Sequence, residues 1–320
     1  MKAAVYYENG GPEVFRYEDV PDPVCHPKGV LVRVEAVSIE GGDVLNRFGG
    51  PLVARPHVVG YQAAGQIVEV GEEVTNFKVG DRVATCGAFG SHAELRSVPA
   101  RGAWRVPVGF DIGRAAVIPV AFGTADDCLF EFGHLKAGQT VLVQAGASGV
   151  GVAAIQLAKR AGARVLATAS SDERLEKLKR LGLDEGINYA VKDVAKEVKR
   201  LTDNKGVDLV VDPVGGSTLQ ASIRSLGYRG RVTMVGGAGR EPMKVDVSSL
   251  MGGNQTLQGV FLGAEIATDR AYDNIQRLID LAAAGEIEVL IDKTFPLSEA
   301  AAAHAHIESR KAVGRVLLIP

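Results

Sequence analysis

The stretch TVLVQAGASGVGVAAIQLAKRAG, residues 140–162, decides the fold of this chain. It begins with a short apolar run rich in β-branched residues, and from Val150 onward apolar residues recur at the spacing of one helix face. Gly146, Gly149 and Gly151 lie between these parts, where they allow a sharp turn and the close approach of a pyrophosphate to the helix N-terminus. The stretch therefore predicts a strand, a tight turn and a helix that together bind a nucleotide.

The glycine pattern matches the dinucleotide fingerprint G-x-G-x-x-G imperfectly. Gly146 and Gly151 take the outer positions, whereas Ser148 takes the middle one and Gly149 stands beside it. Glycine-rich turns also serve ordinary packing, so a purely structural turn stays open as the alternative.

The composition is that of a globular protein of about two domains. At 320 residues the chain exceeds the usual size of a single hydrophobic core. Hydrophobic residues make up 46% of it and charged residues 23%. A formal net charge of -2 gives no electrostatic reason to expect nucleic acid or an anionic membrane as a main partner.

No segment has the pattern of a membrane span, a secretory signal or a cysteine framework. No apolar run approaches the roughly 20 residues needed to cross a bilayer. The segment MKAAVYYENG becomes polar too early for a secretory signal, which predicts a cytoplasmic protein. Cys25, Cys86 and Cys128 are widely spaced and form no C-x-x-C pair, so we expect free thiols.

The part of the chain up to about residue 117 is expected to be rich in β-strands. Apolar or alternating segments, separated by Gly and Pro, occur at residues 3–6, 30–37, 65–70 and 82–85. This spacing predicts a compact, antiparallel, barrel-like domain.

Beyond Pro119, segments typical of strands and helices alternate, which predicts a parallel, doubly wound sheet. The expected strands cover residues 141–144, 164–168, 207–212 and 231–236, and the expected helices cover residues 150–161, 172–181, 193–202 and 217–225. The segments expected to return to the first domain are a helix over 269–284, a strand over 290–295, a helix over 298–309 and a strand over 315–319. The predicted domains are residues 1–117 with 264–320, and residues 118–263.

Five segments resemble one known family in their order and spacing. They are MKAAVYYENGGPEVFRYEDVPDP (1–23), VGYQAAGQIVEVGEEVTNFKVGDRV (59–83), LKAGQTVLVQAGASGVG (135–151), DLVVDPVGG (208–216) and HAHIESRKAVGRVLLIP (304–320). The chain resembles the zinc-independent, quinone oxidoreductase (zeta-crystallin-like) type of the medium-chain dehydrogenase/reductase superfamily. The resemblance implies an α/β protein with a GroES-like β-rich catalytic domain, a Rossmann domain and a nicotinamide cofactor in the cleft between them.

The end of the second expected Rossmann strand favours NADPH over NADH. NAD-specific Rossmann proteins usually place an Asp or Glu there, whereas this chain has Ser170, whose hydroxyl does not repel a 2'-phosphate. By the resemblance, Arg174, Tyr189 and Arg310 match positions on the phosphate side of the cofactor. A solvated helix residue is the alternative for Arg174, and a packing residue is the alternative for Tyr189.

The resemblance also places Thr124 beside the nicotinamide, although a hydroxyl at a helix start explains it equally well. Several later residues follow strands at the edge where open sheets bind ligands, so we expect a mostly apolar cradle there. The predicted cofactor-binding residues are Thr124, Gly146, Ser148, Gly149, Val150, Gly151, Ser170, Arg174, Tyr189, Val235, Gly236, Phe261, Leu262 and Arg310.

No metal site is expected. Zinc-dependent relatives take ligands from three places that here carry Glu40, Tyr61 and Ala121. His304 and His306 stand two residues apart in an expected helix, so they face different directions. Without a Lewis acid to polarise the substrate oxygen, oxidation of an alcohol is disfavoured, whereas reduction of an activated acceptor stays feasible.

Three residues depart from the family pattern near the expected substrate cleft. Glu40 stands where the family commonly has Asn, Asp126 where an aromatic residue is common, and Leu45 where some members have Tyr. Glu40 is able to donate a proton or bind substrate, and a solvated carboxylate at a widened entrance is the alternative. The predicted catalytic residues are Thr124, Tyr61 and Glu40, and the acceptor is a quinone or an α,β-unsaturated carbonyl compound.

Residues 255–262, QTLQGVFL, are expected to form the last strand of the Rossmann sheet. Such a strand leaves an unpaired apolar edge, which invites pairing with a second copy across a two-fold axis. The resemblance implies the same homodimer. An edge covered by the chain's own helix from Asp269 is the alternative.

The favoured hypothesis is an NADPH-dependent reductase that transfers hydride to a small electrophilic acceptor without zinc. The alternative is a non-catalytic NADPH-binding protein with a structural, sensing or RNA-binding role, since proteins resembling this family include lens crystallins and RNA binders. A net charge near zero and the lack of a basic, aromatic patch argue against dedicated RNA recognition.

Overall fold

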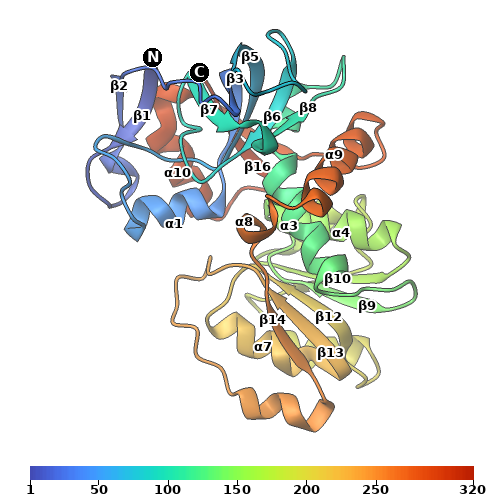
Figure 1. The fold of residues 1–320 in the computed structure, drawn as a ribbon. Helices are drawn as coiled ribbons and strands as arrows, with labels where there is room; N and C mark the ends of the chain where they lie inside the picture. Colours follow the sequence, from blue (N-terminus) through green and yellow to red (C-terminus); the bar gives the residue numbers. More distant parts are fainter. The chain divides into compact units, whose positions relative to one another are not determined.

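The stretch of residues 140–162 folds as strand, turn and helix at the centre of a six-stranded sheet in the computed structural model, which describes residues 1–320 (Figure 1). The strand is β9 (Thr140–Val143) and the helix is α4 (Gly149–Arg160). Every strand pair of this sheet is parallel, and its order is β11-β10-β9-β12-β13-β14. This is the doubly wound order, so the predicted fold class of this part is confirmed.

The other strands of the sheet are β10 (Arg164–Ala169), β11 (Glu185–Asn188), β12 (Val207–Asp212), β13 (Leu226–Met234) and β14 (Thr256–Gly259). No strand was expected at β11, because its sequence EGIN offers one apolar side chain among four residues. The strand expected over residues 255–262 is shorter, since β14 ends at Gly259 and Leu262 begins the short helix α8 (Leu262–Glu265).

Helices cover both faces of this sheet. They are α4, α5 (Asp172–Lys179), α6 (Val194–Leu201) and α7 (Ser217–Ser225). Leu166 of β10 packs with residues of α6 and α7, whereas the next residue, Ala167, lies on the side of α4 and α5. Neighbouring residues of a strand point to opposite faces, so two buried faces explain why the strands read as continuous apolar runs.

Polar side chains at the helix starts define where these helices begin. Ser148, Ser171 and Asp193 each precede a helix and accept a hydrogen bond from a backbone N–H of its first turn. Each cap satisfies a donor that the helix itself leaves unpaired.

Two compact units make up the chain: one comprises Met1–Gly123 and Gly263–Pro320, and the other comprises Thr124–Leu262. The first unit contains a seven-stranded sheet of order β15-β16-β3-β5-β6-β8, in which β7 also pairs with β3. It also contains a three-stranded sheet of order β2-β1-β4. All pairs are antiparallel except β15 with β16.

The strands of this unit are β1 (Lys2–Tyr6), β2 (Arg16–Asp19), β3 (Gly29–Ser38), β4 (His57–Val58), β5 (Gln62–Val70), β6 (Arg82–Cys86), β7 (Leu95–Pro99), β8 (Ala103–Arg105), β15 (Ile291–Pro296) and β16 (Arg315–Ile319). Its main helical segments are α1 (Gly41–Gly49), α2 (Ile112–Ala115), the π-helical η3 (Ile118–Phe122), α9 (Asp269–Ala283) and α10 (Ala300–Glu308). The β-rich character expected for the first part of the chain is thus present.

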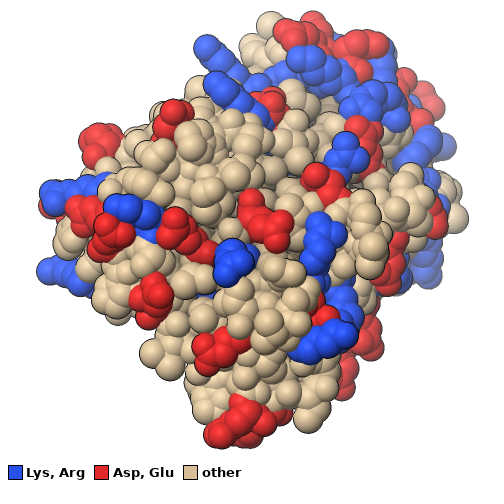
Figure 2. Space-filling model, turned by 90° about the horizontal axis from the view of Figure 1, so that it is seen from above, with Lys and Arg blue, Asp and Glu red and all other residues tan.

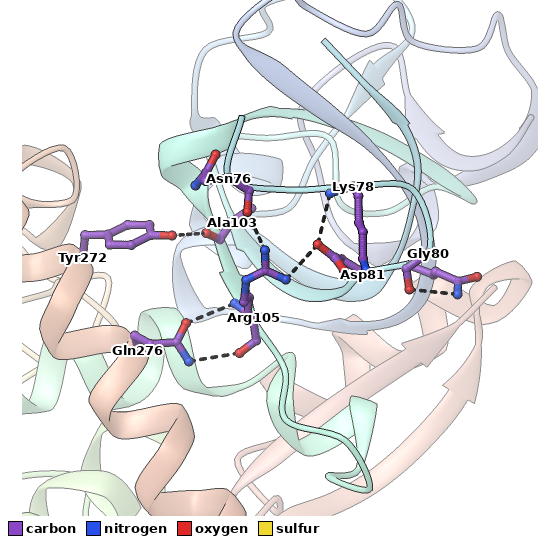
Figure 3. Close-up of polar contacts among 9 residues, drawn as sticks. Asn76, Lys78, Gly80, Asp81, Ala103, Arg105, Tyr272 and Gln276 are labelled. Carbon is purple, nitrogen blue, oxygen red and sulfur yellow. Dashed lines mark hydrogen bonds and ion pairs between the residues drawn. The ribbon is translucent and has the colours of Figure 1, made fainter. Parts of the chain in front are cut away.

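Helix α9 is connected to β8 by hydrogen bonds from Gln276 and Tyr272 (Figure 3). The Gln276 side chain accepts from the N–H of Arg105 and donates to its carbonyl oxygen, both at 3.0 Å. The Tyr272 hydroxyl donates to the carbonyl oxygen of Ala103 at 3.0 Å, and the Arg105 guanidinium pairs with Asp81 at 2.8 Å. The contacts of Gln276 and Tyr272 connect the two segments of the chain that precede and follow Thr124–Leu262, and these segments form one compact unit.

Candidate active site

The turn between β9 and α4 presents backbone N–H groups from the start of the helix. The Ser148 hydroxyl accepts a hydrogen bond from the N–H of Gly151 at 3.1 Å, so this predicted binding residue is the N-cap of α4. The N–H groups of Gly149 and Val150 donate to no group of the chain. Free N–H groups and the positive end of the helix dipole fit phosphate oxygens, so this turn suits a dinucleotide.

Two glycines of the turn are required by close packing within the chain. A Cβ on Gly146 would lie 2.8 Å from the Cβ of Ala167, and one on Gly151 would lie 2.4 Å from the carbonyl oxygen of Ala145. Ala145 itself has a left-handed backbone, with a φ of 49°. The glycines therefore let the start of α4 lie against the strand ends. The same residues thus serve both the packing of the turn and its approach to a phosphate group.

A buried polar network, which the sequence analysis missed, supports the loops at this edge of the sheet. Asp212, at the end of β12, accepts the N–H groups of Val214 and Gly215 through Oδ1, both at 2.9 Å. Its Oδ2 accepts the Ser222 hydroxyl of α7 at 2.8 Å. Asp212 therefore fixes the turn that follows β12, and the polar end of the apolar run DLVVD was the available signal.

The network continues to the phosphate turn. The Gln144 side chain donates to the Ser222 hydroxyl at 3.0 Å and accepts the Thr168 hydroxyl at 2.8 Å. The Thr168 oxygen in turn accepts the N–H of Ala145 at 3.1 Å. Every polar side chain of this chain of contacts is buried and paired, so the ends of β9, β10 and β12 are held in fixed positions.

The predicted 2'-phosphate residues Ser170 and Arg174 lie together at the end of β10. The Arg174 Nη1 donates to the Ser170 hydroxyl at 2.9 Å. Tyr189 lies beside them, because its N–H donates to the carbonyl oxygen of Ala169 at 3.1 Å, and its side chain is 43% exposed. A cation, a hydroxyl and an exposed phenol thus surround the strand end.

The carboxylates near this strand end have partners of their own. Asp172 accepts the side-chain amide of Asn188 at 3.2 Å, and Glu173 pairs with Lys177 at 2.8 Å. Neither takes the place of the ribose-binding acid of NAD-specific proteins, so the donors present fit NADPH. Arg310 lies in the other unit, directly after α10, and its part in the phosphate site stays a prediction.

Thr124 is buried within an unusual helical segment. It lies in the short helix α3 (Gly123–Asp126), which follows the π-helical η3 and precedes the π-helical η4 (Asp127–Glu131). The backbone at Gly123 is helical, so η3 continues into α3 without a break. The Thr124 hydroxyl is therefore inside a helical segment and not at a helix start, which was the alternative to a cofactor role. π-Helical turns are rare and frequent at functional sites, and the sequence carries no local signal for them.

The residues expected to form a mostly apolar cradle, Met234, Val235, Gly236, Phe261 and Leu262, lie at or beyond the ends of β13 and β14. Val235 follows β13, and its N–H donates to the carbonyl oxygen of Asp212 at 3.0 Å. Gly236 comes next, with Phe261 72% exposed and Leu262 buried after β14. Their contact with a cofactor stays a prediction.

Glu40 lies in a buried charged cluster of the β-rich unit, and the alternative of a solvated carboxylate is wrong. Its carboxylate is paired with Arg315 of β16, accepts the side-chain amide of Gln62, and lies 3.4 Å from the Ser38 hydroxyl. Gln62 also accepts the N–H of Val120 in η3 at 2.9 Å. Burial raises the pKa of Glu40, and these donors pull it back.

Asp43 and Tyr61 lie beside Glu40. Asp43 is fully buried at the start of α1 and accepts the N–H groups of Glu40 at 2.8 Å and Tyr61 at 3.1 Å. Burial is the main cause that raises the pKa of Asp43 to about 7. Burial also raises the pKa of the Tyr61 phenol, and the nearby carboxylates of Asp43 and Glu40 add to this shift.

Two of the histidines, His92 and His304, are buried and lie in contact with each other. His92 Nε2 lies 3.0 Å from Nε2 of His304, which is 212 residues away in the chain. Burial lowers the pKa of both groups, that of His92 to about 3. His306 instead contacts Asp292 at 2.7 Å, which confirms that His304 and His306 face different directions.

No group of three or more His, Cys, Asp or Glu side chains in the structure is arranged to hold a metal ion. The Glu40 carboxylate is held by Arg315, Gln62 and Ser38, and Ala121 offers no ligand atom, so Tyr61 has no second ligand beside it for a metal ion. The three cysteines are free thiols, as expected. No helix has the length and apolar character that crossing a membrane requires.

Comparisons with known proteins agree with this arrangement. Residues 26–108 match the model of the alcohol dehydrogenase GroES-like domain, and residues 149–284 match that of the zinc-binding dehydrogenase. The first match confirms the expected GroES-like domain. The second is the description of a family and does not assign a metal to this chain.

Relatives and solved structures cover the whole chain. A 2-haloacrylate reductase of Burkholderia sp is 34% identical over 100% of this chain and 99% of its own length. A quinone oxidoreductase of Pseudomonas aeruginosa is 33% identical over 97% of each. The crystal structure of Escherichia coli quinone oxidoreductase complexed with NADPH superposes with a TM-score of 0.95 at 28% identity, covering 100% of both chains.

Proposed function

We infer that this chain, which belongs to the quinone oxidoreductase family of the medium-chain dehydrogenase/reductase superfamily, is an NADPH-dependent oxidoreductase that reduces a quinone or an activated carbon–carbon double bond. The observation that carries this proposal is the contact between Arg174 and Ser170 at the end of β10. There Ser170 stands in the place of the ribose-binding acid and the Arg174 guanidinium donates to it, beside a turn with free N–H groups.

NADPH is held by two sets of groups in this proposal. The N–H groups of Gly149 and Val150 take the pyrophosphate, and Ser170, Arg174 and Tyr189 take the 2'-phosphate. When bound, the cofactor supplies a hydride. The protein orients its ring through Thr124 and the loops held by Asp212, and keeps water from the reacting carbon.

The test is NADPH oxidation, followed by absorbance, with a panel of benzoquinones, naphthoquinones, enals and enones. Turnover of at least one class at rates well above the uncatalysed reaction supports the proposal. NADPH binding without turnover of any acceptor would instead indicate the non-catalytic, sensing or structural role. Mixed acidic and basic side chains on the face in Figure 2, together with a net charge of -2, favour a small molecule over nucleic acid as the partner.

The reaction proceeds without zinc in this proposal, because Glu40, Tyr61 and Ala121 offer no zinc site of the expected kind. Elemental analysis of protein purified without added metal checks this. Stoichiometric zinc, or activity lost to a chelator and restored by zinc, would contradict it. A cytoplasmic location is proposed from the sequence alone, and cell fractionation tests it.

A homodimer formed through β14 is also proposed. β14 is an edge strand, and Tyr228, Met251 and Phe261 expose large apolar side chains on or near β13 and β14. The Val260 N–H donates to Met234 on β13, so the N–H of Gly259, one residue earlier, points to the free edge. A second copy could pair there across a two-fold axis.

The substitution Gly259→Pro tests this dimer, because it removes the outward N–H at a residue where an added Cβ meets no atom within 4 Å. Light scattering should show a dimer for the wild type and a folded monomer for Gly259→Pro, with Gly259→Ala as the control that keeps the N–H. A monomeric wild type at micromolar concentration would contradict the proposal.

A further inference from the structure

Glu40 and Tyr61 are neighbours in the β-rich unit, but their functional groups differ in availability. The Glu40 side chain is 6% exposed, and Arg315, Gln62 and Ser38 surround its carboxylate. The Tyr61 hydroxyl forms no hydrogen bond within the chain, and its side chain is only partly buried. Of the two, only Tyr61 has a proton-bearing group free to meet a bound molecule.

The backbone of Tyr61 is held from both sides. Its N–H donates to Asp43 at 3.1 Å, and its carbonyl oxygen accepts Nη2 of Arg96 at 2.7 Å and the N–H of Gly87 at 2.8 Å. Asp43 and Arg96 are both buried. A buried carboxylate and a buried guanidinium thus fix the position of one residue, an arrangement that costs desolvation energy and requires good geometry.

The ring of Tyr61 is positioned as well. It lies over Gly42, where an added Cβ would come within 2.2 Å of the ring carbon Cε2 and 2.8 Å of the hydroxyl oxygen. The glycine therefore leaves room for the phenol beside the start of α1. Backbone and ring are both held, while the hydroxyl is left without a partner.

We propose that the acceptor of this enzyme is an activated carbon–carbon double bond and that the Tyr61 hydroxyl donates the proton its α-carbon receives. Asp43 and Arg96 are positioning residues for Tyr61. This proposal rests on the reductase function proposed above, and it chooses between the two acceptor classes left open there.

The two acceptor classes differ in their need for a proton donor. A quinone that gains a hydride becomes a hydroquinone anion, whose oxygen takes a proton from water without help. An enone gains the hydride at its β-carbon, and its π electrons move to the carbonyl oxygen to give an enolate. The saturated product forms only when the α-carbon gains a proton, which is a slower transfer to carbon.

In that step the O–H bond of Tyr61 breaks and its electron pair stays on the phenolate oxygen. The enolate electrons form the new C–H bond, and the phenolate then takes a proton from water. A phenol is a much stronger acid than the α C–H of a saturated carbonyl compound. The transfer is therefore favourable even with the raised pKa of Tyr61.

The substitution Tyr61→Phe tests the proposal with two probes, an α-methyl-substituted enal and a benzoquinone. Turnover of the enal should fall by roughly 100-fold or more, whereas turnover of the quinone should change by less than about threefold. The wild type should give one α-configuration of the saturated aldehyde, and the variant a mixture, because water then protonates either face. Affinity for NADPH, measured by fluorescence without acceptor, should change by less than about twofold.

The matched control is Tyr272→Phe, which removes a hydroxyl bonded to Ala103 in the same unit and should leave both reactions unchanged. Asp43→Asn should also lower the α-selectivity while sparing NADPH affinity, as a positioning role requires. Equal losses with enal and quinone, or a retained α-configuration in Tyr61→Phe, would overturn the proposal. A wild type that reduces quinones but no enal would overturn it and leave the reductase function standing, whereas turnover of neither class would reject both.

Discussion

The phosphate turn of the nucleotide-binding unit and the Glu40 cluster of the β-rich unit both hold polar groups, but they do so in opposite ways. In the turn, Ser148 caps the helix that begins at the next residue by accepting the N–H of Gly151, and the groups offered to a ligand are neutral N–H groups. In the cluster, Glu40, Asp43 and Arg315 are all buried side chains that can carry charge. One of its contacts joins Ser38 to Arg315 across 277 residues.

We therefore expect substitutions in these two regions to affect different properties of the protein. Neutral N–H groups at a helix start carry only the partial charge of the helix dipole, so they cost far less while unbound than an unpaired ion does. A buried charge that loses its partner keeps its full desolvation cost. Substitutions in the cluster should therefore reduce the stability of the protein, whereas substitutions at the phosphate site should mainly reduce cofactor binding.

The largest effect is expected for Glu40→Gln. It leaves Arg315 buried without its carboxylate, which should lower the free energy of unfolding by about 3 kcal/mol or more. Urea unfolding measures this, with the exposed Glu35→Gln of β3 as a control that should change by less than ~0.5 kcal/mol. In an Arg315→Met background the same substitution should cost much less, and an equal cost there would contradict the pairing.

The next effect is expected for Gly151→Ala. The added Cβ would lie 2.4 Å from the carbonyl oxygen of Ala145, so the turn must shift at a cost of about 1 to 3 kcal/mol. Isothermal titration should show NADPH affinity reduced at least about tenfold, because that shift displaces the phosphate-binding N–H groups. Gly252→Ala is the control, since its Cβ meets no atom within 4 Å. Unchanged affinity for NADPH would count against the turn as the phosphate site.

A smaller, cofactor-specific effect is expected for Arg174→Ala. Loss of a charge-assisted contact to a phosphate should weaken NADPH binding by about 1.5 to 3 kcal/mol and NADH binding by little. Lys177→Ala on the same helix removes a cation that is paired with Glu173, and it should not discriminate between the two cofactors. Equal losses of both cofactors in Arg174→Ala would remove the basis for NADPH preference.

Taken per pH unit, the smallest effect is a change in pH dependence caused by Asp43→Asn. Because the pKa of Asp43 rises from 3.8 to about 7 on folding, the folded chain holds this proton more tightly than the unfolded chain between those values. Asp43 therefore makes the free energy of unfolding fall as pH rises from about 4 to about 7, by at most ~1.4 kcal/mol per pH unit. Urea unfolding at several pH values should show that Asp43→Asn removes this part of the slope. Parallel curves for the two proteins would show that Asp43 is ionised normally.

The same contrast explains what could be predicted from the sequence. The phosphate turn depends on residues within one short stretch, and the contact between Ser170 and Arg174 spans four residues. Local spacing determines such contacts, so the turn and the strand and helix around it were predictable. The parallel, doubly wound character of the sheet followed from the alternation of strand and helix patterns, although β11 was not expected.

Contacts between distant residues could not be predicted in this way. The pairing of Glu40 with Arg315, and that of His92 with His304, depends on how strands and helices pack. The π-helical turns around Thr124 depend on tertiary context too, since no residue type is specific for them. The boundaries predicted for the two domains stay a prediction, which limited proteolysis can test.

Arg315 is translated long after the residues that it contacts, which affects the newly synthesised chain. Ser38 leaves the ribosome 277 residues before Arg315, and the whole nucleotide-binding unit, Thr124–Leu262, is translated in between. During that interval Glu40 has no cation to pair with, and Val37 and Ser38 at the end of β3 have no β16 to pair with. An unpaired strand end is open to pairing with other chains, so a chain whose translation stalls before β16 is prone to aggregation.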